Sequence, residues 1–181
     1  MRNLRENDME ERIETEDLIL SKGKYDDWKD IFENLWRHEE SAKYMLWTTV
    51  KTEEKAKEKM RKVIEWQKNH LEYFIYEKKS GKVIGFTGIE EIEKGVYEDT
   101  GIAIGLKFIG QGYGKQVLMA LVNHCFQIKG AEKFVCSCRS ENTASKRMQL
   151  SCGFLYSHSE KRIDKRNGME YILEFYQLLK K

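Results

Sequence analysis

Residues 109–115 offer the most recognisable chemistry in this chain. They read Ile-Gly-Gln-Gly-Tyr-Gly-Lys and stand between a strand-like run (96–104) and a helix-like run (115–127). Alternating glycines leave backbone N–H groups bare where a helix begins, and the helix dipole favours an anion at that end. The segment therefore predicts a phosphate-binding loop, with a plain tight turn as the alternative.

Two familiar phosphate loops do not fit this spacing. A Walker loop requires a glycine at position 109 and Ser or Thr after Lys115, but these positions hold Ile109 and Gln116. The dinucleotide fingerprint G-x-G-x-x-G lacks its third glycine whether it is counted from Gly110 or from Gly112. The loop must serve another kind of phosphorylated ligand.

The length and net charge of the chain argue against nucleic acid and membranes as partners. The 181 residues have a formal net charge of +2, which suits one domain over residues 1–181 and is too balanced for a nucleic-acid protein. No apolar run approaches the roughly 20 residues of a membrane span, and the polar, charged N-terminus is unlike a secretory signal. We expect a cytoplasmic protein without nucleic-acid or membrane partners, with residues 1–11 as a flexible extension.

The four cysteines do not form the pattern of a metal site. Cys136 and Cys138 are spaced C-x-C inside a strand-like run, whereas a zinc site usually has two C-x-x-C pairs. We expect free, buried thiols and no metal.

Hydrophobic periodicity predicts the elements that must position the loop. An amphipathic helix should begin at Asp26 or Asp27, and a second helix should be capped by Thr52. The closing strands should be joined through a type I′ turn at Asn167-Gly168. The predicted strands are residues 12–21, 72–78, 83–92, 96–104, 133–138, 153–157 and 169–178, and the later helices are 115–127 and 142–150. The order β-α-α-β-β-β-α-β-α-β-β predicts an α/β (α+β) protein with a mixed sheet flanked by helices.

Three blocks of this sequence resemble the GNAT superfamily of acetyl-CoA-dependent N-acetyltransferases. Residues 101–114 look like its fourth strand and pyrophosphate loop, whose pattern is Arg/Gln-x-x-Gly-x-Gly/Ala. Residues 142–154 look like its Asn-x-x-Ser block ending in Gly-Phe. Residues 14–20 resemble the start of the branch that includes ribosomal-protein N-terminal acetyltransferases. The departures are Ile109 for Arg or Gln, Asp17 for Arg, and Ser151 for Lys.

The resemblance implies a splayed central sheet that binds acetyl-CoA. Strand backbone would pair with the pantetheine arm, and amides at the splay would polarise the thioester carbonyl. Since Ile109 brings no side-chain contact, backbone amides should hold the pyrophosphate. The expected cofactor-binding residues are Ile102, Ala103, Ile104, Ile109, Gly110, Gln111, Gly112, Tyr113, Gly114, Lys115, Asn142, Ser145 and Lys146.

The chemistry of the implied reaction selects the remaining candidates. An alkyl amine has a pKa of roughly 10 and must lose a proton before it attacks a thioester. Asp99 stands where the resembling branch often has Glu, and Glu90 on the neighbouring strand is the second candidate, whereas Glu98 should face the other way. Ser145 matches a serine implied to lie near the CoA sulfur. The aromatic candidates for an acceptor cleft are Tyr44, Trp47 and Tyr171.

The resemblance therefore implies acetyl transfer from acetyl-CoA to a primary amine. The acceptor would be a protein N-terminus or a small amine such as a polyamine or an antibiotic. The alternative is a non-catalytic CoA-binding or sensing module on the same fold, because no single base is obvious. A homodimer is a candidate assembly.

Overall fold

The computed structural model describes residues 12–181, so the predicted extension over residues 1–11 lies outside the described part. One eight-stranded sheet organises these residues, in the order β1-β2-β3-β4-β5-β6-β8-β7. Neighbouring strands are antiparallel except β5 and β6, which are parallel. The strands are β1 (Arg12–Glu14), β2 (Leu18–Ser21), β3 (Leu71–Glu77), β4 (Val83–Glu93), β5 (Val96–Ile104), β6 (Lys133–Arg139), β7 (Leu155–Ile163) and β8 (Glu170–Leu179).

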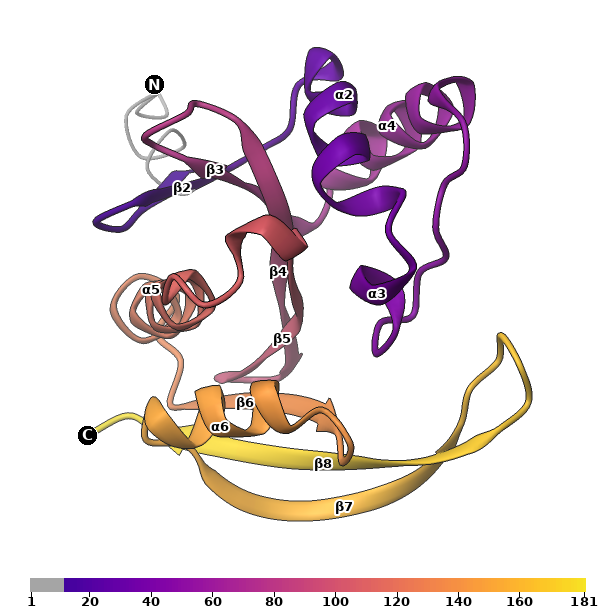
Figure 1. The fold of residues 1–181 in the computed structure, drawn as a ribbon. Coiled ribbons are helices and arrows are strands. Elements are labelled where there is room, and N and C mark those ends of the chain that lie inside the picture. Colours follow the sequence, from indigo (N-terminus) through magenta and orange to yellow (C-terminus); the bar gives the residue numbers. More distant parts are fainter. Residues whose placement is uncertain (1–11) are drawn as a thin grey trace.

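Helices cover both faces of the sheet, which confirms the predicted mixed α/β class. In Figure 1, α5 lies on one side of β4 and β5, while α2 and α4 lie on the other. Each side has its own apolar core, because the strands between them bury side chains in alternation. The helical segments are η1 (Tyr25–Asp27), α2 (Trp28–Ile31), η2 (Phe32–Trp36), α3 (Glu39–Ala42), α4 (Glu53–Gln67), η3 (Leu106–Phe108), α5 (Tyr113–Gln127) and α6 (Thr143–Ser151).

The first predicted strand and the first predicted helix cap are both wrong in detail. Residues 12–21 form a hairpin of two short strands, because Thr15 turns the chain and its hydroxyl accepts a hydrogen bond from the Leu18 amide at 3.0 Å. Asp27 lies inside the helical segment and its carboxylate accepts from the Lys24 amide at 2.7 Å. Thr52 does cap α4, accepting from the Lys55 amide at 3.3 Å.

The turn between β7 and β8 also differs from the prediction. A type I′ turn needs a positive φ at both central residues, but within residues 12–181 only glycines have positive φ, and here that residue is Gly168. The chain instead makes a longer loop, closed by a hydrogen bond from the Gly168 amide to the Asp164 carbonyl at 2.7 Å. The longer loop gives the hairpin an arm that reaches towards α3 (Figure 1).

The central sheet opens between β5 and β6. Their pairing covers only three residues, ending at Glu98 opposite Val135. On the other side of β5, Thr87 pairs with Ile102 and Ile89 pairs with Asp99, so one residue of β4 faces two residues of β5 in a bulge. Gly101, in the bulge, has φ +110. The bulge bends β5 away from β6, and Asp99 is the first residue beyond the paired part.

Candidate functional site

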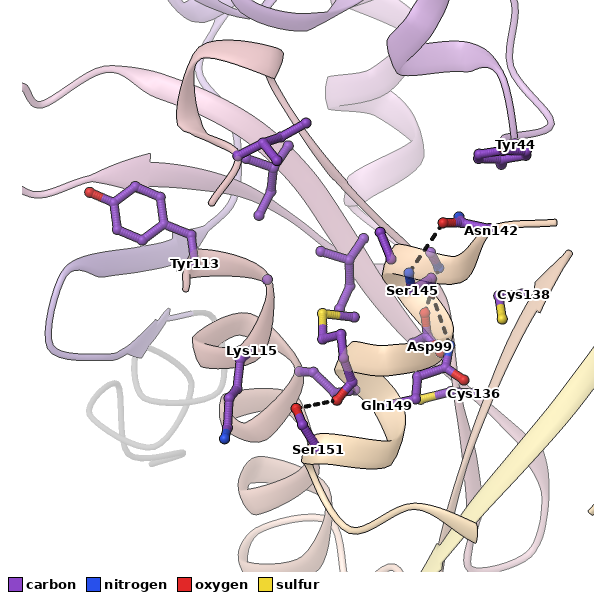
Figure 2. Close-up of a pocket in the computed structure, with 18 of the residues that line it drawn as sticks. Tyr44, Asp99, Tyr113, Lys115, Cys136, Cys138, Asn142, Ser145, Gln149 and Ser151 are labelled. Atoms are coloured by element: carbon purple, nitrogen blue, oxygen red, sulfur yellow. Dashed lines mark hydrogen bonds between the residues drawn. The ribbon is translucent and has the colours of Figure 1, made fainter. Parts of the chain in front are cut away.

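A cavity of about 460 Å³ occupies the opening between β5 and β6. We call it the loop-side pocket, because the glycine loop and the first turn of α5 form one end of it. The strands β5 and β6 supply its middle and α6 supplies the opposite wall (Figure 2). The parts of the chain singled out by sequence motifs, residues 101–114 and 142–154, therefore meet at one place.

The glycine loop presents unbonded amides to this pocket. Gly110 and Gly112 have φ +83 and +78, conformations that other L-residues rarely adopt. Within residues 12–181, no backbone N–H of residues 110–115 donates a hydrogen bond to another backbone group. A side chain at Gly114 would meet the Met148 sulfur at 2.9 Å, so the small residue lets α5 and α6 approach. The loop has the form of an anion site made from backbone alone.

Most of the residues predicted to bind the cofactor line the loop-side pocket. These are Ile102, Ile104, Ile109, Gly110, Gly112, Tyr113, Gly114, Lys115, Asn142 and Ser145.

Three of the predicted residues do not line the pocket. Ala103 is 4% exposed and packs into the core beside α2 and α4, on the other face of β5. Gln111 is exposed and its side-chain amide donates to the Lys107 carbonyl at 3.4 Å. Lys146 turns towards β8, where its ammonium pairs with the Glu174 carboxylate at 2.8 Å.

The start of α6 places a chain of polar groups along the pocket wall. Asn142 caps the helix, and its side-chain oxygen accepts from the Ser145 amide at 3.2 Å. The Ser145 hydroxyl accepts from the Gln149 side-chain amide at 3.1 Å, one helical turn further on. Gln149 is 3% exposed, and its carbonyl oxygen has no partner among the described residues. Sequence reasoning missed Gln149, since an isolated glutamine carries no motif.

Asp99 lies at the inner end of the pocket, beside Cys136 and Gln149 in Figure 2. Burial raises its pKa to about 6; a hydrogen bond with Cys136 and one from the Gly101 amide lower it, and the nearby Glu98 charge raises it. One carboxylate oxygen accepts from the Gly101 amide at 3.1 Å, and the other is buried and has no nitrogen or oxygen donor among residues 12–181. A carboxylate with these properties can accept a proton near neutral pH.

A second cavity, of about 580 Å³, adjoins the first. We call it the strand-face pocket. It contains all three aromatic residues predicted for the acceptor cleft, Tyr44, Trp47 and Tyr171, together with Glu90. Both cavities are bordered by residues of the opening, among them Asp99 and Cys138. Asp99 therefore stands where the two cavities meet.

Glu98 also borders the strand-face pocket, which the sequence interpretation did not include. It pairs with Glu90 across β4 and β5, whereas Asp99 pairs with Ile89. Burial raises the pKa of Glu98, the Ser137 hydroxyl that donates to it at 3.2 Å lowers it, and the charge of Glu90 raises it. As strand alternation predicts, Glu98 and Asp99 point to opposite faces of β5. Both nevertheless border the strand-face pocket, because the sheet is open beside them.

Two arginines and one aspartate form an ion-pair cluster beside the strand-face pocket, and one of them, Arg139, lines it. The Asp164 side chain is 2% exposed and binds Arg139 on β6 at 2.6 Å and Arg166 at 2.7 Å. Arg166 also donates to the Ala42 carbonyl at 2.9 Å, and more weakly to Trp47 at 3.4 Å. These bonds hold the pKa of Asp164 well below its usual range. The Asp164 cluster thus ties the β7–β8 loop to the segment after α3.

Two properties of the described residues complete the site. Within residues 12–181 no three His, Cys, Asp or Glu side chains are grouped so that they could hold a metal ion. The helices of the same part of the chain are too short or too polar to cross a membrane.

Known proteins of the same fold share this arrangement of elements. The chain aligns with a GNAT-family acetyltransferase from Bacillus anthracis at a TM-score of 0.80 and 19% identity, over 93% of this chain and 98% of that one. It aligns with the ribosomal L7/L12 alpha-N-protein acetyltransferase RimL at 0.78 and 20% identity, over 94% of both chains. The microcin C7 self-immunity acetyltransferase MccE, in complex with acetyl-CoA and AMP, aligns at 0.76 and 18% identity, over 92% and 94%.

At the level of sequence, no protein of curated function matches significantly. The family model described as "Acetyltransferase (GNAT) domain" matches residues 17–155, which include the glycine loop, the opening of the sheet and all of α6. The chain therefore belongs to the GNAT acetyltransferase family.

Proposed function

We propose that this acetyltransferase transfers the acetyl group of acetyl-CoA to a primary amine. The observation that carries the proposal is the meeting of two cavities at Asp99, one with an anion-binding loop and one with unpaired carboxylates. A thioester that enters along the loop-side pocket and an amine that enters from the strand-face pocket would come together there. Positioning of this kind supplies much of the catalysis of a two-substrate reaction.

The loop-side pocket suits acetyl-CoA in two respects. The amides of residues 110–115 would hold the pyrophosphate, and the unpaired edge of β5 at Ile102 and Ile104 would bind the extended pantetheine arm as an added strand. MccE, which shares the fold, was solved with acetyl-CoA bound. The donor is the best supported part of the proposal.

The chemical step needs a base and a group near the leaving sulfur. Ionised Asp99 accepts a proton from the ammonium of the acceptor, directly or through water, and the free amine attacks the thioester carbon. The bond from that carbon to sulfur then breaks. The Ser145 hydroxyl, whose oxygen already accepts from Gln149, keeps its own proton available to the departing thiolate. In this scheme Glu90 binds the acceptor and does not take the proton. It lies opposite Glu98 across β4 and β5, on the face of the sheet away from Asp99.

Incubation with acetyl-CoA and a panel of amines tests the proposal. We expect CoA thiol release that depends on amine, with the acetylated amine identified by mass spectrometry. Binding of CoA without turnover of any amine would support the alternative, a non-catalytic CoA-binding module. Absence of CoA binding at millimolar concentration, measured by calorimetry, would exclude both.

Removal of the Ser145 hydroxyl should slow the reaction without weakening cofactor binding. We expect Ser145→Ala to lower kcat by about tenfold, with little change in KM for acetyl-CoA, because the lost hydrogen bond forms mainly as negative charge develops on sulfur. Thiol release under saturating amine measures this. Thr143→Ala removes an exposed hydroxyl from the same helix and should retain wild-type rates. Equal rates for both variants would contradict the role of Ser145.

The two lysines among the predicted cofactor-binding residues should behave differently. Lys115 lines the loop-side pocket, whereas Lys146 is bound to Glu174. Lys115→Ala should raise KM for acetyl-CoA about threefold at low salt, because an exposed ion pair contributes a free energy of that order. Lys146→Ala should leave KM unchanged. Steady-state kinetics at 20 and 300 mM NaCl measure both. A larger effect from Lys146→Ala would mean that its side chain moves to the cofactor.

Assembly and location remain predictions from the sequence. The homodimer candidate has one suggestive feature, since the outer strand β7 exposes Leu155, Tyr156 and Ile163 at 70%, 54% and 63%. Light scattering of the purified protein decides its assembly. A cytoplasmic location is tested by fractionation.

A further inference from the structure

We propose that the acceptor is a flexible aliphatic polyamine, with its reacting amine at Asp99 and a second ammonium between Glu90 and Glu98. This inference rests on the proposed function and names the substrate class of the same site. It concerns the strand-face pocket, whose charge, strand register and apolar walls all suit such a ligand.

The strand-face pocket contains more negative than positive charge. Three carboxylates border it, Glu90, Glu98 and Asp99, and none of them forms an ion pair with a residue of the described part of the chain. Arg139 is the only basic residue among the described residues that line it, and its guanidinium is bound to Asp164. Outside the lining, the charge of Arg162 lowers the pKa of Glu98. A cationic ligand would add the positive charge that the lining residues lack.

Asp99 carries a specific sign of a missing ligand. One of its carboxylate oxygens is buried without a nitrogen or oxygen donor in residues 12–181, the weak Cys136 thiol being the one donor beside the carboxylate besides the Gly101 amide, and Asp99 lies where the two cavities meet. A buried acceptor without a donor is costly, and native proteins rarely leave one empty unless a ligand completes it. An ammonium is the donor that suits a carboxylate best.

The register of β4 and β5 creates a second cation position. Glu90 and Glu98 are directly opposite each other across the strands, an arrangement of like charges that destabilises a sheet. The pair is tolerable if a positive group lies between the two carboxylates in the working complex. Because Asp99 faces the other side of β5, this position is separate from that of the reacting amine. A ligand that fills both needs two cationic nitrogens joined by a flexible linker.

The walls of the pocket suit an aliphatic chain. The pocket has a volume of about 580 Å³, and apolar side chains such as Met45, Trp47, Phe86 and Leu173 form its walls, which suits a chain of methylene groups. Beside the pocket, Arg166 donates to the Ala42 and Trp47 carbonyls and so ties the β7–β8 loop to the segment that contributes Trp47 to the walls. A peptide with a single terminal ammonium would leave the Glu90–Glu98 pair without a partner.

The reaction of a diamine balances without any further reagent. The ammonium at Asp99 loses a proton to the carboxylate, and the free amine nitrogen forms a bond to the acetyl carbon, giving a tetrahedral intermediate in which the bond from carbon to the CoA sulfur is intact. The nitrogen of this intermediate then loses a second proton, the bond from carbon to sulfur breaks, and the departing thiolate gains a proton. The products are the monoacetylated diamine, with its distal ammonium still charged, CoA thiol and one proton released to solvent.

A matched pair of amines tests this inference. Butane-1,4-diamine and pentan-1-amine have the same number of heavy atoms but differ by one charge, and a short peptide with a free N-terminus represents the other class. We expect kcat/KM for the diamine to exceed that for the monoamine and the peptide by about 30-fold, as for charged hydrogen bonds. The preference should shrink at 0.5 M NaCl, because salt screens the distal pair.

Variants separate the distal site from the chemistry. The double variant Glu90→Gln/Glu98→Gln should reduce the ratio of diamine to monoamine kcat/KM at least tenfold, chiefly through KM. Glu93→Gln removes an acid from the same strand outside the strand-face pocket and should keep the wild-type ratio. Circular dichroism confirms that each variant is folded.

The outcomes distinguish this inference from the proposed function. If the monoamine or the peptide is acetylated as well as the diamine, the inference is overturned and the proposed function stands. If CoA binds and none of the three amines reacts, the inference is overturned and the non-catalytic alternative gains support. A diamine preference that survives the double variant would also overturn the assignment of Glu90 and Glu98.

Discussion

Asp99→Asn should lower kcat/KM at pH 7.5 by about 10²- to 10³-fold, the usual contribution of a positioned base. The wild-type rate should rise with pH through about 6, because burial raises the pKa of Asp99 to that value and only the ionised form accepts a proton. The variant should lose this dependence. Initial rates between pH 5 and 9 measure it, with acetyl-CoA binding followed separately by calorimetry.

The same substitution should affect stability in the opposite direction. A carboxyl group whose pKa is raised by folding binds its proton more tightly in the folded state, so its ionisation costs stability as pH rises from about 4 to 6. Above pH 6 the full cost applies. Asp99→Asn should therefore raise the free energy of unfolding at pH 8 by about 1–3 kcal/mol, and change it little at pH 4. Denaturant unfolding at the two pH values measures the difference.

Glu98→Gln is the matched control for the assignment of the base. It removes a carboxylate from the adjacent position of the same strand, and the rate should still depend on the ionisation of Asp99, with a pKa somewhat lower than in the wild type because the charge of Glu98 is gone. If Glu98→Gln abolishes that dependence and Asp99→Asn does not, Glu98 is the base and the amine approaches from the other face of β5.

Gly101→Ala should both destabilise the protein and damage the site. Gly101 has φ +110, a conformation open to glycine but strained for alanine, and the added methyl carbon would lie 2.9 Å from the Met45 side chain. We expect a loss of about 2–3 kcal/mol, or roughly 5–10 °C in Tm. Since this residue lies in the bulge that opens the sheet, kcat/KM should fall more than tenfold in the fraction that remains folded. Thermal unfolding and rates at 20 °C measure the two effects.

Two further variants identify the cause of that loss. Gly81→Ala places a methyl group at a φ of +70 with no atom within 4 Å, in the turn after β3 and away from the site. It should cost about 1 kcal/mol and leave activity unchanged. Met45→Ala added to Gly101→Ala relieves the contact but not the backbone strain, so most of the loss should persist. Full recovery would show that the contact with Met45, rather than the bulge conformation, was responsible.

Helix caps and hydrophobic spacing predicted most helices and strands, because these elements depend on residues close to one another in the sequence. The cap at Thr52, the stripe of α4 and the helix after the glycine loop all follow from spacing along the chain. The predictions failed where a bond between distant residues decides the local structure. Residues 12–21 form a hairpin, with the Thr15 hydroxyl donating to Gln116 on α5 at 2.7 Å, and no feature of the local sequence reports that contact.

The residues of the candidate site also fall into those that local sequence predicts and those that it does not. Residues 110–115 and Asn142 could be recognised from the sequence, since a glycine loop presents its own backbone amides and a helix cap bonds an amide only three residues further on. Lys146 could not be placed, because its ammonium is directed by Glu174 on β8, a strand formed 28 residues later. Gln149 and Glu98 were missed for a related reason. Each belongs to no sequence motif and becomes a candidate only because the folded chain places it beside the opening of the sheet.

The amino-acid sequence by itself thus determined the family and predicted the donor, whereas only the tertiary structure revealed the strand-face pocket on which the proposed acceptor depends. A loop that binds phosphate through its amides is a local device, so its type can be read from seven consecutive residues. The strand-face pocket is assembled from residues 44–47 after α3 and from β4, β5, β6 and β8, and Asp164 joins Arg139 of its lining to Arg166 on the β7–β8 loop. Its charge and shape come from long-range packing, which pairs residues that have no fixed spacing along the chain.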